Sequence, residues 1–92
     1  MPVDWSAHAL ADLKTISEYI QRDRGPLTAN RVIRNIYEAI QNLTSMPNSG
    51  RSGRVAGTRE LVLAPLPYIV IYQTSAERLL VLNIVHGAQK WP

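Results

Sequence analysis

The residues best suited to chemistry in this sequence are basic and lie in its second half. Arg51, Arg54 and Arg59 follow one another with no acidic residue between them. Guanidinium groups can hold a phosphate through paired N–H donors, and a cluster of them raises the local positive potential. The cluster therefore predicts a site that binds phosphate, RNA or another target. A solvated basic loop fits the same sequence about equally well, and so does an ion pair of Arg59 with Glu60 or a neighbour.

The end of the sequence adds an acid–base candidate and an aromatic one. Histidine is the side chain that titrates nearest neutrality, so His86 is a candidate general acid or base. Trp91 can stack on a nucleic-acid base. Each residue also has a structural interpretation: His86 can hold the C-terminal turn by a hydrogen bond, and a terminal tryptophan can simply pack against the fold.

Length and composition predict one globular domain spanning residues 1–92, with a net charge of +3 whose excess lies in the second half. There is no cysteine, which excludes disulfides and thiolate metal sites. His8 and His86 show no ligand spacing, so we expect neither a metal nor a cofactor. The first residues show no signal-peptide pattern, and no apolar run is long enough for a membrane helix. We expect a cytoplasmic protein with no membrane partner.

The first half of the sequence predicts a short strand followed by two helices. Residues 3–5 alternate as a strand does, and Ser6 is suited to cap the helix that follows. The apolar face of that helix would consist of Leu10, Leu13, Ile16 and Ile20. Residues 23–26 end it, Thr28 would cap a second helix, and residues 46–50 end that one. With so short a link, the two helices should pair antiparallel.

The second half predicts three strands. Alternation begins at Arg59, Pro65 and Pro67 interrupt it, and residues 68–72 form the next strand. Residues 79–86 are apolar on both faces, which indicates a central strand. Short connections favour an antiparallel meander. Helices first and strands later predict an α+β fold, with the helix pair on one face of a small, mainly antiparallel sheet.

A chain of this length has no further element to cover the second face of that sheet. Tyr68, Val70 and Tyr72 point opposite to Ile69 and Ile71. We assign the first three to the uncovered face. An open apolar surface of this kind would be a partner site, because monomers rarely leave large apolar patches bare.

The order of these features resembles the RelE/ParE superfamily of bacterial toxins from type II toxin–antitoxin systems. The resemblance runs along the whole chain and is carried by Trp5-Ser6, Ala11-Asp12-Leu13, Ile16 to Ile20, Ala39-Ile40, Leu43, Met46 to Arg51, Gly57 to Leu61, Pro67 to Tyr72 and Val85 to Pro92. It implies a β-α-α-β-β-β fold and growth arrest relieved by a cognate antitoxin from an adjacent gene. The antitoxin would then cover Tyr68, Val70 and Tyr72, and a homodimer or a hetero-oligomer with the antitoxin is possible.

The resemblance implies two different targets. RelE-like members cleave mRNA on the ribosome, and this implies that His86, Arg59 and Lys90 are catalytic, while Arg51, Arg54 and Trp91 bind RNA or another target. ParE-like members inhibit DNA gyrase. This sequence departs from the RelE-like pattern in two places. Positions 60 to 63 lack the lysines of that pattern, and Ile69 stands where RelE-like toxins have an arginine. Ribosome-dependent mRNA cleavage, gyrase inhibition and a non-toxic binding module stay open as alternatives.

Overall fold

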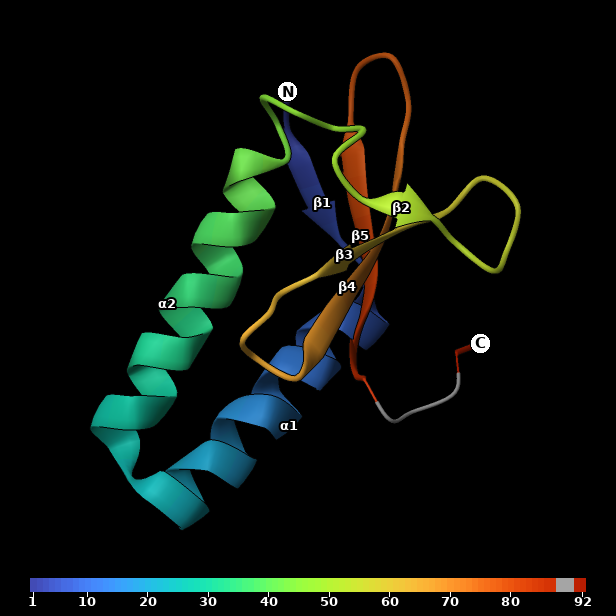
Figure 1. The fold of residues 1–92 in the computed structure, drawn as a ribbon. Helices are drawn as coiled ribbons and strands as arrows, with labels where there is room; N and C mark the ends of the chain where they lie inside the picture. Colours follow the sequence, from blue (N-terminus) through green and yellow to red (C-terminus); the bar gives the residue numbers. More distant parts are fainter. Residues whose placement is uncertain (88–90) are drawn as a thin grey trace.

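The computed structural model describes residues 1–87 and 91–92 and consists of two helices on one face of a sheet (Figure 1). The elements in chain order are β1 (Val3–Trp5), α1 (Ala7–Arg24), α2 (Pro26–Asn42), β2 (Arg51–Ser52), β3 (Arg59–Val62), β4 (Tyr68–Thr74) and β5 (Leu79–His86). The predicted α+β fold, with the helix pair ahead of the main strands, is confirmed. In the part of the chain described, neither helix has the length and apolar character needed to cross a membrane.

Ser6 sets the start of α1 and ties it to the sheet. Its side-chain oxygen accepts a hydrogen bond from the N–H of Ala9 at 3.0 Å, as predicted for a helix cap. The same hydroxyl donates to the backbone carbonyl of Leu82 at 2.6 Å. One side chain therefore fixes both the first turn of the helix and its position beside β5.

The turn between the helices is a single residue, which is tighter than predicted. Gly25 has a φ of 91°, a conformation that ends α1 and is readily adopted by glycine alone. Pro26 then begins α2 at once, at a position where a missing N–H costs no helical hydrogen bond. The prediction that Thr28 caps the second helix is wrong, because Thr28 lies inside α2 and Gly25 is its cap.

Over the described ranges, 1–87 and 91–92, the sheet has five strands in the order β1-β5-β4-β3-β2. β1 and β5 run parallel, whereas the other neighbouring pairs are antiparallel. The final strand is thus covered on both edges, as its apolar sequence predicted. The sequence analysis missed β2, which places Arg51 opposite Glu60 and Ser52 opposite Arg59. This short strand converts the predicted basic loop into a hairpin.

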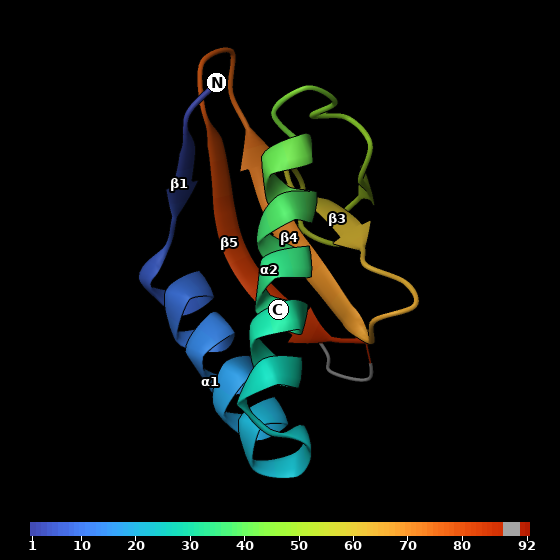
Figure 2. The same cartoon turned by 90° about the vertical axis from the view of Figure 1, so that its left-hand side faces the viewer.

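The core lies between the helix pair and the sheet, and Figure 2 shows both helices in front of β4 and β5. Its buried residues are Ala9 and Ile16 of α1, Ile36 and Ile40 of α2, Leu43 just after it, Val70 and Tyr72 of β4, and Leu79, Val81 and Ile84 of β5. Leu10, predicted on the apolar face of α1, is instead 54% exposed. Leu13 and Ile20 pack against the core as expected.

The predicted assignment of Tyr68, Val70 and Tyr72 to the uncovered face is wrong. Val70 and Tyr72 are both 0% exposed within the core, and Tyr68 packs against it. Strand alternation shows that the three residues share a face, but it does not show which face the helices cover. A surface partner therefore cannot reach Val70 or Tyr72 in this fold.

A bulge shifts the pairing of β4 with β5. Ile71 lies opposite Asn83, but Tyr72 lies opposite Val81, so Leu82 is an extra residue in β5. Val81 and Ile84 consequently both join the core, although they are three positions apart. Simple alternation would have placed them on opposite faces.

The face of the sheet opposite the helices, here called the outer face, is not bare. Ile71 is 1% exposed and Val85 is 8% exposed. Figure 1 shows the C-terminus on this side of the sheet, and Trp91 donates from Nε1 to Oδ1 of Asn83 at 3.0 Å. The predicted groove lined by Tyr68, Val70 and Tyr72 does not lie here, because these residues belong to the core side of the sheet.

Candidate functional site

Arg59 holds the connection between α2 and β2. Its Nη1 donates to the backbone carbonyl of Gly50 at 2.8 Å and to that of Asn48 at 3.3 Å. The residue is half-buried, and these acceptors belong to the segment that the sequence marked as the end of the second helix. The guanidinium is thus already used within the fold. The alternative prediction of an ion pair between Arg59 and Glu60 is not observed among the described contacts.

Glu60 pairs with Arg51 instead. The Nε and Nη2 atoms of Arg51 lie 3.1 and 2.9 Å from Oε1 of Glu60, and the other carboxylate oxygen accepts from the backbone N–H of Arg54 at 3.3 Å. The Glu60 side chain is 9% exposed, whereas that of Arg51 is 60% exposed. The carboxylate therefore neutralises one charge of the cluster and fixes the base of the β2–β3 hairpin.

Of the three clustered arginines, Arg54 is the one whose guanidinium is not bound within the described part of the fold and can contact a partner. Its side chain is exposed on the loop at residues 53–58, which projects from the body of the molecule in Figure 1. Within residues 1–87 and 91–92, its guanidinium makes no hydrogen bond or ion pair. Beside it, Val55 is 40% exposed. Farther along the sheet, Arg78 is bound to Asp4, with Nε 2.6 Å from Oδ2.

His86 ends β5 beside the start of β4, whereas this loop leads into β3 near the other end of β4. It lies opposite Tyr68 in the ladder, and the two rings meet edge to face with centroids 5.9 Å apart. Arg59 lies opposite Tyr72. At a rise of about 3.3 Å per residue, the two register positions are about 13 Å apart along β4. The fold therefore does not bring the predicted catalytic residues His86 and Arg59 together.

The remaining predicted site residues are at the C-terminus. Trp91 is half-buried and its indole N–H binds Asn83, which agrees with the structural interpretation of this residue. Lys90 lies outside the described residues. Among the residues that the structure describes, no single site therefore unites those that the sequence analysis grouped for RNA cleavage.

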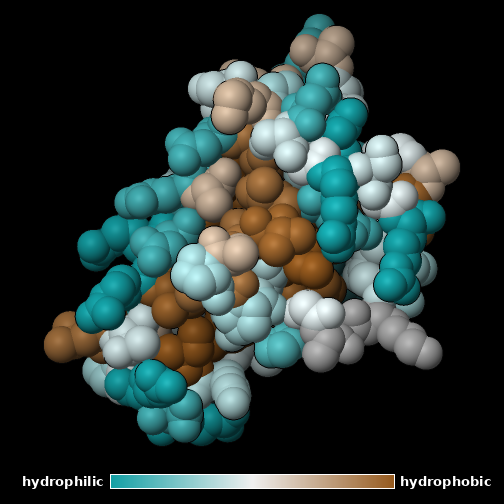
Figure 3. Space-filling view, viewed as in Figure 1, coloured by the Kyte–Doolittle hydropathy of each residue, from teal (hydrophilic) through white to brown (hydrophobic). Residues whose placement is uncertain are grey.

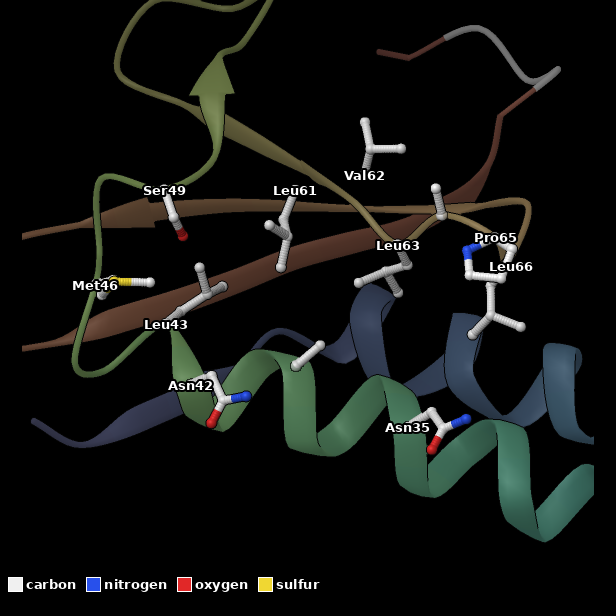
Figure 4. A pocket seen from close by; sticks show the side chains of 12 residues that line it. Asn35, Asn42, Leu43, Met46, Ser49, Leu61, Val62, Leu63, Pro65 and Leu66 are labelled. Atoms are coloured by element: carbon white, nitrogen blue, oxygen red, sulfur yellow. The ribbon is translucent and has the colours of Figure 1, made fainter.

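The sequence analysis missed an apolar groove between α2 and β3, here called the α2–β3 groove. Its volume is about 450 Å³, and its apolar lining includes Ala39, Leu43, Met46, Leu61, Leu63 and Leu66. Figure 4 shows the leucines of β3 and the following loop directed toward α2, with Val62 directed away. Figure 3 shows the same region as a band of apolar surface between more polar borders. The sequence signal that could have indicated this groove was the alternation that places Leu61 and Leu63 on the same face of β3.

The groove runs beside an exposed edge of the sheet. β2 begins at Arg51, opposite Glu60, so in the described part of the chain Leu61 and Val62 have no strand on the side away from β4. The N–H of Leu63 donates to the backbone carbonyl of Tyr68 in β4. Because successive residues of an antiparallel strand direct their backbone groups to alternate sides, the N–H and C=O of Val62 point away from β4. Val62 is also 47% exposed. An edge of this kind can accept a further strand.

Comparison with known proteins agrees with this fold. A family described as "ParE toxin of type II toxin-antitoxin system, parDE" matches residues 3–91. Y4kP of Sinorhizobium fredii is 42% identical over 90 residues, covering 98% of this chain and 92% of the relative. Toxin RelE2 of Caulobacter vibrioides is 36% identical over 87 residues, covering 95% and 96%.

Two solved structures are similar in shape. A structure titled as the chromosomal ParDE TA system from P. aeruginosa aligns with a TM-score of 0.87 and 27% identity, covering 94% of this chain and 95% of the other. A YoeB/ParE toxin from Agrobacterium tumefaciens aligns with a TM-score of 0.63 and 21% identity, covering 94% and 98%, which supports the fold alone. With a family match along nearly its whole length, this chain belongs to the ParE toxin family of type II toxin–antitoxin systems.

Proposed function

We propose that this protein is a growth-arresting toxin that acts by binding DNA gyrase and that a cognate antitoxin neutralises it. The observation that carries the choice of target is the position of Arg59. Its guanidinium is bound to the carbonyls of Gly50 and Asn48, and it lies far along the sheet from His86. RNA cleavage through the 2′-hydroxyl needs an acid–base pair and cations around one phosphate. Inhibition by binding needs only a complementary surface.

The loop at residues 53–58 is the surface we assign to the target. It presents the available charge of Arg54 and the exposed side chain of Val55 on a hairpin whose base is fixed by Glu60. Arginine beside an exposed apolar residue is a common combination at protein interfaces. The fixed base reduces the ordering cost when the loop binds.

Two single substitutions separate the binding mechanism from cleavage. Arg54→Ala removes an exposed charge that has no described partner, so we expect reduced growth arrest on induction with an unchanged melting temperature. His86→Gln removes a titrating group, and general acid–base catalysis typically contributes about 10²–10⁴-fold in rate. Under the binding mechanism, growth arrest by His86→Gln should persist.

Growth curves after induction, with expression levels checked, measure both effects. Arg31→Ala, which removes an exposed arginine of α2, is the matched control for the loss of one positive charge. Loss of arrest in His86→Gln, with full arrest in Arg54→Ala and mRNA cut in the wild type, would contradict the proposal and support cleavage.

The α2–β3 groove is the surface that we assign to the antitoxin. Membership of a toxin–antitoxin family implies a cognate partner. The exposed edge of β3 offers main-chain hydrogen bonds, and the leucines beside it offer apolar pockets, as in proteins that bind a peptide by adding a strand. We therefore expect an extended antitoxin segment with alternating apolar side chains to lie along β3.

Met46→Glu tests this assignment. Met46 lines the groove and is 64% exposed, so a charge there should weaken antitoxin binding with little effect on folding. An unpaired charge facing apolar side chains should raise the Kd by tenfold or more, since about 1.4 kcal/mol corresponds to tenfold. Leu27→Glu, at an 80% exposed site near the start of α2, is the control. Equal binding of both variants in calorimetry with the purified antitoxin would refute the assignment.

A further inference from the structure

A second cleft lies between α1 and the ends of β4 and β5. Its volume is about 370 Å³, within the range of sites that bind small ligands. Its lining includes Asp12, Thr15, Tyr19, Tyr68 and His86, together with apolar residues. It shares no lining residue with the α2–β3 groove or with the loop at residues 53–58. The functions proposed above therefore leave it without a role.

Asp12 supplies a carboxylate whose orientation is fixed. Its Oδ2 accepts from the backbone N–H of Ile84 at 2.9 Å and from Nδ2 of Asn83 at 3.1 Å. Both bonds reach the same oxygen. Among the residues that the structure describes, none donates to Oδ1. Asp12 can thus accept a hydrogen bond from a ligand without giving up its contacts to β5.

The aromatic residues of the cleft form its other half. Tyr19 is 54% exposed as a residue, and Tyr68 is half-buried, with its ring against that of His86. Burial, and to a lesser degree the neighbouring Tyr19, raises the pKa of Tyr68, so its phenol stays neutral at physiological pH. The lining described contains no lysine or arginine. A fixed negative charge and electron-rich aromatic faces therefore surround one space.

We propose that this cleft binds the guanidinium group of an arginine side chain presented by a partner protein. A planar guanidinium can stack on a tyrosine ring while its N–H groups bind a carboxylate. The ammonium of lysine is a point charge and cannot use a flat ring as well. A phosphate would be repelled by Asp12. The proposal is independent of the toxin's target.

The test uses acetyl-arginine amide as the probe and acetyl-citrulline amide, which has nearly the same shape but no charge, as its control. We expect arginine to shift the ring resonances of Tyr68 and His86 in NMR titrations, and citrulline to leave them in place. Binding should also lower the pKa of Tyr68, because a nearby cation favours the phenolate. Arginine keeps its own charge throughout that titration.

Tyr19→Ala should weaken arginine binding about three- to tenfold, the amount expected for loss of a partly desolvated cation–π contact. The site is exposed and alanine favours a helix, so folding should be preserved. Leu10→Ala, on the same helix and 54% exposed, is the matched control. Equal shifts by citrulline, unchanged affinity in Tyr19→Ala, or adenosine monophosphate shifting these rings where arginine does not would each overturn the proposal.

Discussion

At the scale of the residue, the sequence identified the chemical groups but not their partners. Arg51, Arg54 and Arg59 look equivalent in the sequence, yet only Arg54 keeps an available charge. The difference arises from β2, whose two residues place Arg51 across from Glu60. A strand that short leaves no periodicity to recognise. Arg59 was equally unpredictable, because its acceptors are backbone carbonyls and carry no sequence signal.

Tyr72 is the residue that links the connecting segment to the core. Its hydroxyl donates to the carbonyl of Pro47 at 2.8 Å and accepts from the N–H of Gly50 at 2.9 Å, and the side chain is 0% exposed. Tyr72→Phe keeps the ring but leaves that N–H buried and unpaired, which typically costs about 1–3 kcal/mol. Urea unfolding should show this loss. Tyr37→Phe, at a 49% exposed site, should lose little, and equal stability of both variants would refute the role.

At the scale of the element, periodicity predicted the helices, the main strands and the central position of β5. It could not decide which face of β4 the helices cover, because alternation is symmetric between the two faces. The bulge at Leu82 then breaks the alternation, so Ile84 joins the core against the simple pattern. The α2–β3 groove was missed for a related reason. It is formed by elements that only tertiary packing brings side by side.

The edge strand β1 is held to the turn before β5 by Asp4 and Arg78. Because Asp4 hydrogen-bonds Arg78, its pKa is lowered. A lowered pKa means that the pair stabilises the fold above the ordinary aspartate value of about 3.9 and loses this effect as the pH falls below it. Asp4→Asn should therefore melt slightly lower than the wild type at neutral pH, and the difference should be smaller at about pH 3. The same difference at both pH values would contradict this contribution.

At the scale of the whole molecule, the fold engages Arg51, Arg59 and Arg78 in internal contacts and presents two separate surfaces. One is the apolar α2–β3 groove, and the other is the loop carrying Arg54. Because the two surfaces are separate, a partner bound in the α2–β3 groove does not have to cover the loop that we assign to the target. An antitoxin on the groove would neutralise the toxin either by also covering the loop or by sterically blocking the access of the target to it. Complexes of the antitoxin with the loop variant Arg54→Ala and with the groove variant Met46→Glu would distinguish these two modes.

The most direct test of the central claim compares the two activities of the purified wild-type protein. Gyrase supercoiling would be measured beside primer extension on mRNA in a translating extract, each with and without the cognate antitoxin. The account predicts inhibited supercoiling, relief of that inhibition by the antitoxin, and intact mRNA. New cleavage ends in the mRNA, with supercoiling unaffected at the same protein concentration, would contradict it.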